Sequence, residues 1–273
     1  MTVIQYPGKK NSIAKWIISH FPHDYQEMTY LEPFFGSGCI FFRKERSAVE
    51  TINDIDNEIA NLFMQIRDNP DELMLLLMNT PWSRYEYNLA FEKTGNLTEK
   101  ARRCIVRFWF TVAANVRAKN GMRFEIKRNT KGLNYFHLRL PEIIYRATER
   151  LKHGKKGIVQ IENRNVFELI PVYDRENVLM YLDPPYLLET RKNKKVYKHE
   201  FEYAEHEELL KLITRSKAKI IISGYENELY KKYLSGWRKE QTTTKDQAGN
   251  RKKECIWMNY RENQKGLFLA GNL

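Results

Sequence analysis

Cysteine is scarce in this sequence, and long apolar runs are absent from it. The three cysteines, Cys39, Cys104 and Cys255, lie far apart, and none belongs to a C-x-x-C pair. This pattern argues against a disulfide framework and against a structural zinc site. The six histidines form no cluster with the spacing of metal ligands, so we predict no metal.

The sequence also contains no segment typical of a membrane protein. No apolar segment approaches the roughly 20 residues that a membrane-spanning helix requires. Residues 1–10 (MTVIQYPGKK) lack the apolar core of a signal peptide. We therefore expect a cytoplasmic protein without a membrane partner.

What the sequence does contain is positive charge on an ordinary globular composition. Of its 273 residues, 42% are hydrophobic and 29% are charged, which suits one large or two modest folded domains. Lysine and arginine number 46 and aspartate and glutamate 34, giving a net charge of +12. Such a balance favours a polyanionic partner such as nucleic acid.

Much of this charge lies in two stretches. One covers residues 115–139 and contains a single acid, Glu125, and the other follows closely on residues 183–186. Both could be solvated loops, or both could flank an active site and hold phosphates. The basic residues are Arg117, Lys119, Arg123, Lys127, Arg128, Lys131 and Arg139 in the first stretch and Arg191, Lys192, Lys194, Lys195 and Lys198 in the second.

The order of predicted elements indicates an α/β fold with a parallel sheet. Alternating and apolar runs predict strands at residues 28–32, 48–53, 157–162, 177–182, 219–223, 237–242 and 254–260. Helical periodicity predicts helices at residues 12–20, 141–152, 204–215 and 226–233, a short helix after Gly38, and mostly helix from 58 to about 115. The sheet therefore starts before residue 57 and resumes after 156. We predict a catalytic domain from residues 1–57 and 156–273, with a helical, basic insertion at 58–155.

A glycine turn follows the first predicted strand. Gly36-Ser37-Gly38 would let the backbone approach a ligand closely, and Asp54, at the end of the next strand, could bind ribose hydroxyls. The third glycine of the dinucleotide fingerprint is absent, because position 41 is Phe41. A nucleoside ligand without a pyrophosphate, such as S-adenosylmethionine, needs only the close approach and the ribose acid.

Asp183-Pro184-Pro185-Tyr186 stands directly after the apolar strand at 178–182. Two prolines cannot continue a central strand, so they fix a rigid corner at the carboxyl edge of the sheet. The corner presents a carboxylate, free carbonyls and an aromatic ring. These groups suit a planar base with an exocyclic amine: Tyr186 would stack on the base, and Asp183 and the Pro184 carbonyl would accept the amine hydrogens. The simpler reading is a strand-ending turn with a packed tyrosine.

Taken together, the motifs resemble those of the Dam-type (α-group) DNA adenine-N(6) methyltransferases over nearly the whole chain. The resemblance rests on five segments in the family's order: 6–10 (YPGKK), 31–38 (LEPFFGSG), 53–56 (NDID), 183–186 (DPPY) and 221–227 (IISGYEN). It implies a Rossmann-like, S-adenosylmethionine-dependent methyltransferase sheet in which 58–155 is the target-recognition insertion. Two positions depart from the family's pattern: Lys9 replaces a common glycine, and Asn165 replaces a frequent acid.

The resemblance also implies roles for individual residues. The catalytic group would be Asp183, Pro184, Pro185 and Tyr186. The cofactor would be held by Tyr6 and Lys10; by Glu32, Pro33, Phe34, Gly36 and Gly38 around its methionine part; by Asp54 at the ribose; by Ile55, Asn165 and Val166 at the adenine; and by Asp183. DNA would be contacted by Arg117, Lys119, Arg123, Lys127, Arg128, Lys131, Arg139, Arg191, Lys192 and Lys194.

The activity so implied is methyl transfer from S-adenosylmethionine to the 6-amino group of adenine in duplex DNA. The base would be flipped out of the duplex, the methyl group would pass directly, and S-adenosylhomocysteine would be the product. We expect a monomer, encoded by a prokaryote or a phage, with a possible cognate restriction endonuclease. Two alternatives stay open: methylation of a base amine in RNA, and a catalytically silent DNA-binding protein of the same fold.

Overall fold

The computed structural model describes residues 2–112, 119–124, 131–154, 157–191, 197–245 and 251–261. Seven strands occur in these segments: β1 (Thr29–Glu32), β2 (Val49–Asn53), β3 (Ile158–Glu162), β4 (Val178–Leu182), β5 (Lys219–Gly224), β6 (Arg238–Lys245) and β7 (Arg251–Met258). The helices are α1 (Ala14–Ile18), α2 (Asn57–Asp68), α3 (Pro70–Met78), α4 (Arg84–Leu89), α5 (Leu97–Phe110), α6 (Lys131–Asn134), α7 (Leu140–Leu151), α8 (Val166–Val172), α9 (Tyr203–Ile213) and α10 (Glu228–Leu234). A π-helical turn at Tyr135–Arg139 precedes α7, and a 3-10 turn lies at Leu188–Thr190.

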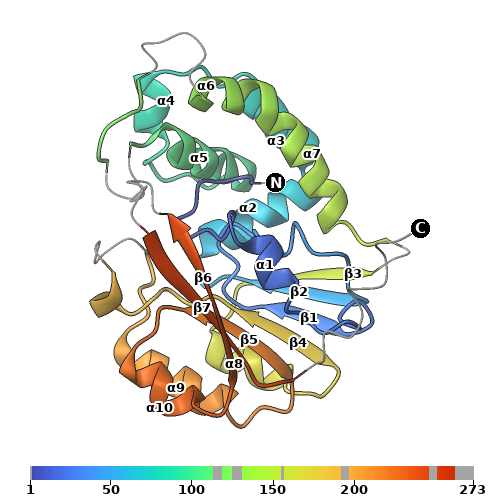
Figure 1. The fold of residues 1–273 in the computed structure, drawn as a ribbon. Coiled ribbons are helices and arrows are strands. Elements are labelled where there is room, and N and C mark those ends of the chain that lie inside the picture. Colours follow the sequence, from blue (N-terminus) through green and yellow to red (C-terminus); the bar gives the residue numbers. More distant parts are fainter. Residues whose placement is uncertain are drawn as a thin grey trace, which may run out of the picture.

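All seven strands form one sheet in the order β3-β2-β1-β4-β5-β7-β6. Strands β1 to β5 pair in parallel, whereas β7 runs antiparallel to both of its neighbours. The chain moves outward from β1 to β3 and then returns to place β4 beside β1, so the winding direction reverses between these two strands. Open α/β sheets bind ligands beyond the carboxyl ends of the strands at such a reversal. The predicted α/β fold is confirmed (Figure 1).

Each face of the sheet has its own apolar core, because alternate residues of a strand point to opposite faces. Tyr181 of β4 and Ile221 of β5 belong to the core that includes α1, α2, α5 and α7. Leu182 and Ile222, one residue further along, belong to the core formed with α8, α9 and α10. The central strands are therefore buried on both faces, which explains their continuous apolar runs.

The helices between β2 and β3 gather above the sheet in Figure 1. Helix α2 begins at Asp56, whose carboxylate accepts the Glu58 amide at 3.1 Å, and α5 begins at Asn96, whose side chain accepts the Glu99 amide at 2.8 Å. Their buried side chains belong to the same core as one face of the sheet. The division of the chain into a catalytic domain and an insertion at 58–155 stays a proposal.

Three local features differ from the sequence prediction. Residues after Gly38 form turns rather than a helix, although Phe42 N–H still bonds to the Gly38 carbonyl at 2.9 Å. Strand β7 ends at Met258, before the predicted residue 260. Helix α8 was not predicted, because it spans only seven residues and contains Pro171, which normally opposes a helix. Within the described segments, no helix is long and apolar enough to cross a bilayer.

Candidate active site

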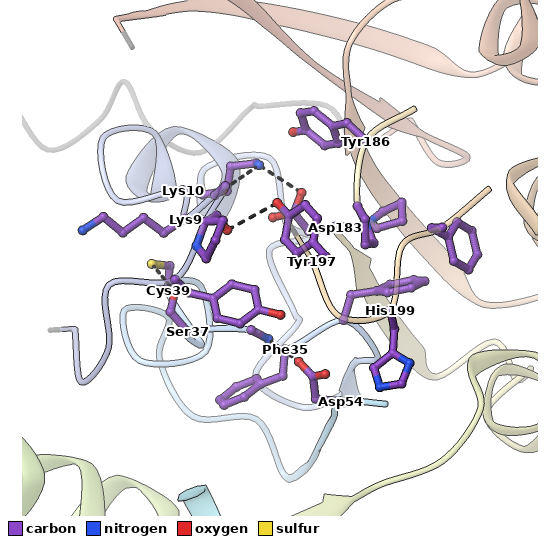
Figure 2. Close-up of a pocket in the computed structure, with 18 of the residues that line it drawn as sticks. Lys9, Lys10, Phe35, Ser37, Cys39, Asp54, Asp183, Tyr186, Tyr197 and His199 are labelled. Carbon is purple, nitrogen blue, oxygen red and sulfur yellow. Dashed lines mark hydrogen bonds and ion pairs between the residues drawn. The ribbon is translucent and has the colours of Figure 1, made fainter. Parts of the chain in front are cut away.

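A cavity of about 1110 Å³ opens at the carboxyl ends of β1, β2 and β4. Its lining includes the N-terminal segment at 5–13, the glycine turn after β1, the acidic turn after β2, the corner after β4 and residues 197–202, together with side chains from α5, the start of α8 and β7. Figure 2 shows Asp183, Tyr186 and Lys10 toward one end of the cavity and Asp54 toward the other. Folding thus brings residues from all five segments that carry the family resemblance to one cavity.

The glycine turn requires its glycines. Gly36 and Gly38 have φ angles of +51° and +64°, and a Cβ on Gly38 would lie 2.4 Å from the ring of Phe35. The buried carboxylate of Asp54 accepts the Gly36 amide at 2.8 Å through one oxygen and the Asp56 amide at 2.9 Å through the other. Asp54 therefore holds the glycine turn against the acidic turn. Its predicted contact with a ribose would be added to this structural role.

Glu32 ends β1 inside the protein, with an exposed fraction of only 2%. Its carboxylate accepts the Tyr30 hydroxyl at 2.7 Å and the Phe41 amide at 3.1 Å, and it also lines the cavity. Burial raises the pKa of Glu32 to about 8, and the charge of Asp183 contributes to the rise. A cation placed in the cavity would relieve this cost, which suits the predicted methionine ammonium.

The corner after β4 presents Asp183 with its two oxygens in different roles. Oδ1 accepts the Ser223 hydroxyl at 2.6 Å and the Lys10 ammonium at 3.0 Å. No hydrogen bond within the described residues reaches Oδ2, so that oxygen is available to a ligand. Lys10 Nζ also donates to the Gly8 carbonyl at 2.9 Å. The sequence assigned both Lys10 and Asp183 to the cofactor site, and the contact of Lys10 with a cofactor stays a prediction.

Lys10 is charged although it is buried. Burial lowers the pKa of Lys10, but the carboxylates of Asp183 and Glu254 raise it by more, and the pKa lies above its ordinary 10.5. The same ammonium sits 4.4 Å from the centroid of the Tyr186 ring. It therefore lies between the Asp183 carboxylate and the ring that was predicted to stack on a base.

Tyr186 is fixed by neighbours that the sequence did not indicate. Its ring packs edge-to-face on Tyr225, with centroids 4.7 Å apart and an angle of 72°, and its hydroxyl donates to Glu254 Oε2 at 2.7 Å. Burial, and after it the charges of Asp183 and Glu254, raise the pKa of Tyr186 well above 10, so the phenol stays protonated. In the sequence, Glu254 stands out only as an acid that follows three basic residues. The sequence does not indicate that it contacts Tyr186.

The predicted methionine end of the cofactor site is lined by aromatic rings. The ring centroids of Tyr6 and Tyr197 lie 6.0 Å apart, and a Cβ on Gly36 would be only 3.0 Å from the Tyr6 ring. Phe34 packs edge-to-face on Phe201 at 5.5 Å. The carbonyl of Pro33 accepts the Asn53 side chain at 3.0 Å. The roles of Tyr6, Pro33 and Phe34 toward a cofactor stay predictions.

The predicted adenine end lies beside the start of α8. Ile55 is 43% exposed and lines the cavity, as does Val166, which is buried. Asn165 caps α8, because its side-chain oxygen accepts the Phe167 amide at 3.0 Å. The amide oxygen has a second lone pair and Nδ2 is a donor, so both can still serve the predicted contact with adenine.

The basic candidates separate into paired and exposed groups. Arg191 forms an ion pair with Glu200 at 2.5 Å, and Lys198 forms one with Asp56 at 3.0 Å, so both belong to the cavity wall. Arg123 lines the cavity and donates from Nε to the Thr111 carbonyl at 2.8 Å. Lys119 and Arg139 are exposed, and Lys131 lies in α6. Arg117, Lys127, Arg128, Lys192, Lys194 and Lys195 lie outside the described residues.

Comparison with known families gives a match over most of the chain. Residues 6–248 match the family described as D12 class N6 adenine-specific DNA methyltransferase. This chain belongs to that family. The five segments that carried the resemblance all fall inside the matched region, and the resemblance is confirmed. Glu254 lies beyond it.

Two individual proteins can be compared with this D12 family member. The Type II methyltransferase M1.LlaDCHI of Lactococcus lactis subsp. cremoris is 26% identical over 196 residues, which cover 67% of this chain and 64% of that protein. The chain thus matches less than two thirds of the relative's length. The solved structure of the rRNA methyltransferase aviRa from Streptomyces viridochromogenes is 14% identical, covers 93% of this chain and 85% of its own, and has a TM-score of 0.41. So loose a structural likeness adds nothing to the argument.

Proposed function

We propose that this protein transfers a methyl group from S-adenosylmethionine to the 6-amino group of adenine in duplex DNA. The observation that carries the proposal is the corner after β4. There, Asp183 directs a free carboxylate oxygen toward a cavity that also contains the glycine turn and the ring of Tyr186. Family membership names adenine as the base and DNA as the substrate.

The cavity residues fit the proposed cofactor. Glu32 is a buried carboxylate whose hydrogen-bond partners are a hydroxyl and an amide, so an ammonium would supply the missing charge. Asp54 and Asn165 offer polar atoms for the ribose and the adenine, and Ile55 offers an apolar contact. The volume of about 1110 Å³ exceeds the roughly 300–1,000 Å³ of an ordinary small-molecule site, which leaves room for a base beside the cofactor.

The bound cofactor supplies a methyl group already activated on a sulfonium. The protein's task is therefore to align the amine and exclude water. Adenine's amine is a weak nucleophile, because its lone pair is delocalised into the ring. Hydrogen bonds from the amine to Asp183 Oδ2 and to the Pro184 carbonyl would favour a pyramidal nitrogen whose lone pair faces the methyl group. After transfer the nitrogen carries the positive charge, and Asp183 is placed to receive its surplus proton.

Stacking of the base on Tyr186 requires the Lys10 ammonium to move off that ring. The ammonium contacts both Asp183 Oδ1 and the Tyr186 ring. The base amine would use the other carboxylate oxygen, Oδ2, and stacking on Tyr186 would replace the cation–π contact. Stacking also offsets part of the few kcal/mol needed to flip the base.

The region that reads the DNA sequence belongs to the same proposal. Phe108 of α5 and Arg123, which both lie between β2 and β3, line the cavity. We assign target recognition to residues 58–155. A monomeric state and a cognate restriction endonuclease also remain proposals.

The function is tested by sequencing DNA with a method that reads modified bases. Cells lacking adenine methylation would express either the wild-type protein or Asp183→Ala. We expect N6-methyladenine at one short sequence with the wild-type protein and none with the variant. Methylated RNA without methylated DNA would support the RNA alternative. Unmodified nucleic acid combined with intact DNA binding would support the silent DNA-binding protein.

A further inference from the structure

Glu254 reaches the active site because of the direction of β7. This strand runs antiparallel to β5, and their register pairs Gly224 with Cys255. The residue before Cys255 therefore lies beside the residue after Gly224, so Glu254 meets Tyr225 at the carboxyl edge of the parallel strands. Glu254 is 8% exposed and lines the cavity.

Glu254 acts on two tyrosines at once. It accepts the Tyr186 hydroxyl at 2.7 Å, and its charge acts on the phenol of Tyr225. Burial first, and then the charge of Glu254, raise the pKa of Tyr225 above its ordinary 10. Both phenols therefore stay protonated and act as donors. The carboxylate therefore holds the outer end of the Tyr186 ring, which packs edge-to-face on Tyr225.

Two lysines complete the arrangement. The Lys10 ammonium lies 4.4 Å from the centroid of the Tyr186 ring, and the Lys252 ammonium lies 5.3 Å from that of Tyr225. Lys10 is also 3.0 Å from Asp183 (Figure 2). The volume between the Tyr186 ring and the catalytic carboxylate is thus the volume that a base must take when its amine reaches Asp183.

We propose that Glu254 is a positioning residue that fixes the rings of Tyr186 and Tyr225 as perpendicular walls of the pocket for the target base. This proposal rests on the proposed function, because it assigns the pocket to a flipped base. Glu254 touches neither the base nor the cofactor in this scheme. It acts through the Tyr186 hydroxyl, and the packing of Tyr186 on Tyr225 carries the constraint to the second ring.

The physical reason is preorganisation. A phenol ring anchored only at its Cβ can turn about two bonds, and every turn removes the surface on which the base stacks. A hydrogen bond between a phenol and a carboxylate is charge-assisted and holds the far end of the ring. Because the ring is fixed before the base arrives, the flipped base loses less free energy in ordering the pocket.

The test compares Glu254→Ala and Glu254→Gln with a matched control, Glu240→Gln, in the full-length protein. Glu240 lies in the same β-hairpin but pairs with Arg238 at the surface. For Glu254→Ala we expect kcat/KM for duplex DNA to fall about 10- to 100-fold, the range for one hydrogen bond to a charged group. Cofactor affinity should stay within about twofold. Glu254→Gln should stay within about fivefold of wild type, since an amide oxygen still accepts a phenol.

A double-mutant cycle with Tyr186→Phe identifies the path of the effect. This variant keeps the ring and removes only the hydroxyl. If Glu254 acts through that bond, the double variant Tyr186→Phe/Glu254→Ala should be little worse than the poorer single variant. Fully additive losses would overturn the proposal. Equal losses in Glu254→Gln and Glu254→Ala would do so too, because they would mean that the charge matters and the bond does not.

A second readout does not depend on methyl transfer. NMR of protein labelled with ¹³C at tyrosine Cζ follows each phenol. Both Glu254 variants should shift the signals of Tyr186 and Tyr225, and Glu240→Gln should leave them in place. Unchanged signals would overturn the proposed positioning role of Glu254. Absence of adenine methylation by the wild-type protein would instead overturn the proposed function, while this spectrum would still report on the rings.

Discussion

At the scale of single residues, Asp183 divides its carboxylate between the protein and the cavity. One oxygen is held by Ser223 and Lys10, which fixes the plane of the carboxylate. The other faces the space where an amine would arrive. This division would give a residue in a loop the fixed geometry that the proposed transition-state hydrogen bond requires.

Replacing Asp183 should therefore abolish methyl transfer and spare most of the cofactor affinity. For Asp183→Ala we expect turnover to fall about 100-fold or more, the usual effect of losing a transition-state hydrogen bond. A radiolabelled-methyl assay measures turnover, and calorimetry measures cofactor binding. Asp71→Ala, at an exposed position in α3, serves as the control. Turnover within about threefold of wild type would contradict the assigned role.

The raised pKa of the buried Glu32 carboxyl predicts that cofactor affinity depends on pH. Because its pKa is raised to about 8, the group is protonated below pH 8 in the free protein. An ammonium ligand requires the ionised form, so binding must release a proton. Between pH 7 and pH 6, cofactor affinity should fall about tenfold, since each pH unit below the pKa reduces the ionised fraction by that factor.

Calorimetry in buffers of different ionisation enthalpy would measure both the affinity and the released proton. Glu32→Gln should bind more weakly and lose the pH dependence. Glu27→Gln, at an exposed glutamate, should retain it. Equal wild-type affinities at pH 6 and pH 7 would refute the ammonium contact with Glu32.

At the scale of elements, one buried ion cluster joins α7 to the sheet. Glu50 of β2 accepts hydrogen bonds from Lys44 at 2.6 Å and from Arg150 of α7 at 2.7 Å. The Glu50 and Lys44 side chains are fully buried, and the Arg150 guanidinium stacks on the Phe41 ring at 3.8 Å. The cluster thus ties the last helix before β3 to the strand that carries the acidic turn.

Removing the charge of Glu50 should destabilise the protein strongly. Burial raises the pKa of Glu50, but Arg150 and Lys44 lower it by more, so the carboxylate is ionised and pairs with the buried Lys44 and the largely buried Arg150. Glu50→Gln should therefore cost about 3–5 kcal/mol in the free energy of unfolding. Urea denaturation measures this loss. Glu149→Gln, in an exposed pair with Lys152 on the same helix, should cost less than about 1 kcal/mol. A similar loss in both variants would contradict the importance of the buried cluster.

At the scale of the whole molecule, the protein has a net charge of +12. Some of its basic residues form ion pairs in the cavity wall, and others are available for the proposed contact with DNA. Arg191 and Lys198 balance acids beside the cavity, so only part of the second basic stretch can serve phosphates. The exposed Lys119 and the cavity-lining Arg123 come from the first stretch. These two residues allow phosphate contacts and base contacts to be tested separately.

Lys119→Ala should weaken binding to every duplex about equally. Loss of one phosphate contact lowers the salt dependence of binding by about one unit. Arg123→Ala should instead relax discrimination at one base pair by about 1–3 kcal/mol, because a guanidinium can pair bidentately with guanine. Titrations of cognate and scrambled duplexes at several salt concentrations separate the two effects. Lys211→Ala, on α9, is the control. If neither variant changes affinity, salt slope or specificity, the first stretch is not the recognition element.

The sequence by itself determined which residues meet a backbone requirement. The strand before Asp183 cannot continue, because two prolines follow that residue, and a turn with positive φ carries Gly36 and Gly38. Such features are local, so they are readable without knowing what lies across the sheet. The α/β order of strands and helices follows from the same local periodicity.

Only the tertiary structure decided which side chains meet across long sequence distances. The antiparallel register of β7 brings Glu254 to Tyr186, 68 residues away, and folding pairs Lys10 with Asp183. It likewise pairs Lys198 with Asp56 across 142 residues. Charge pairing in a buried site depends on distance and desolvation, and neither quantity has a signature in the order of residues.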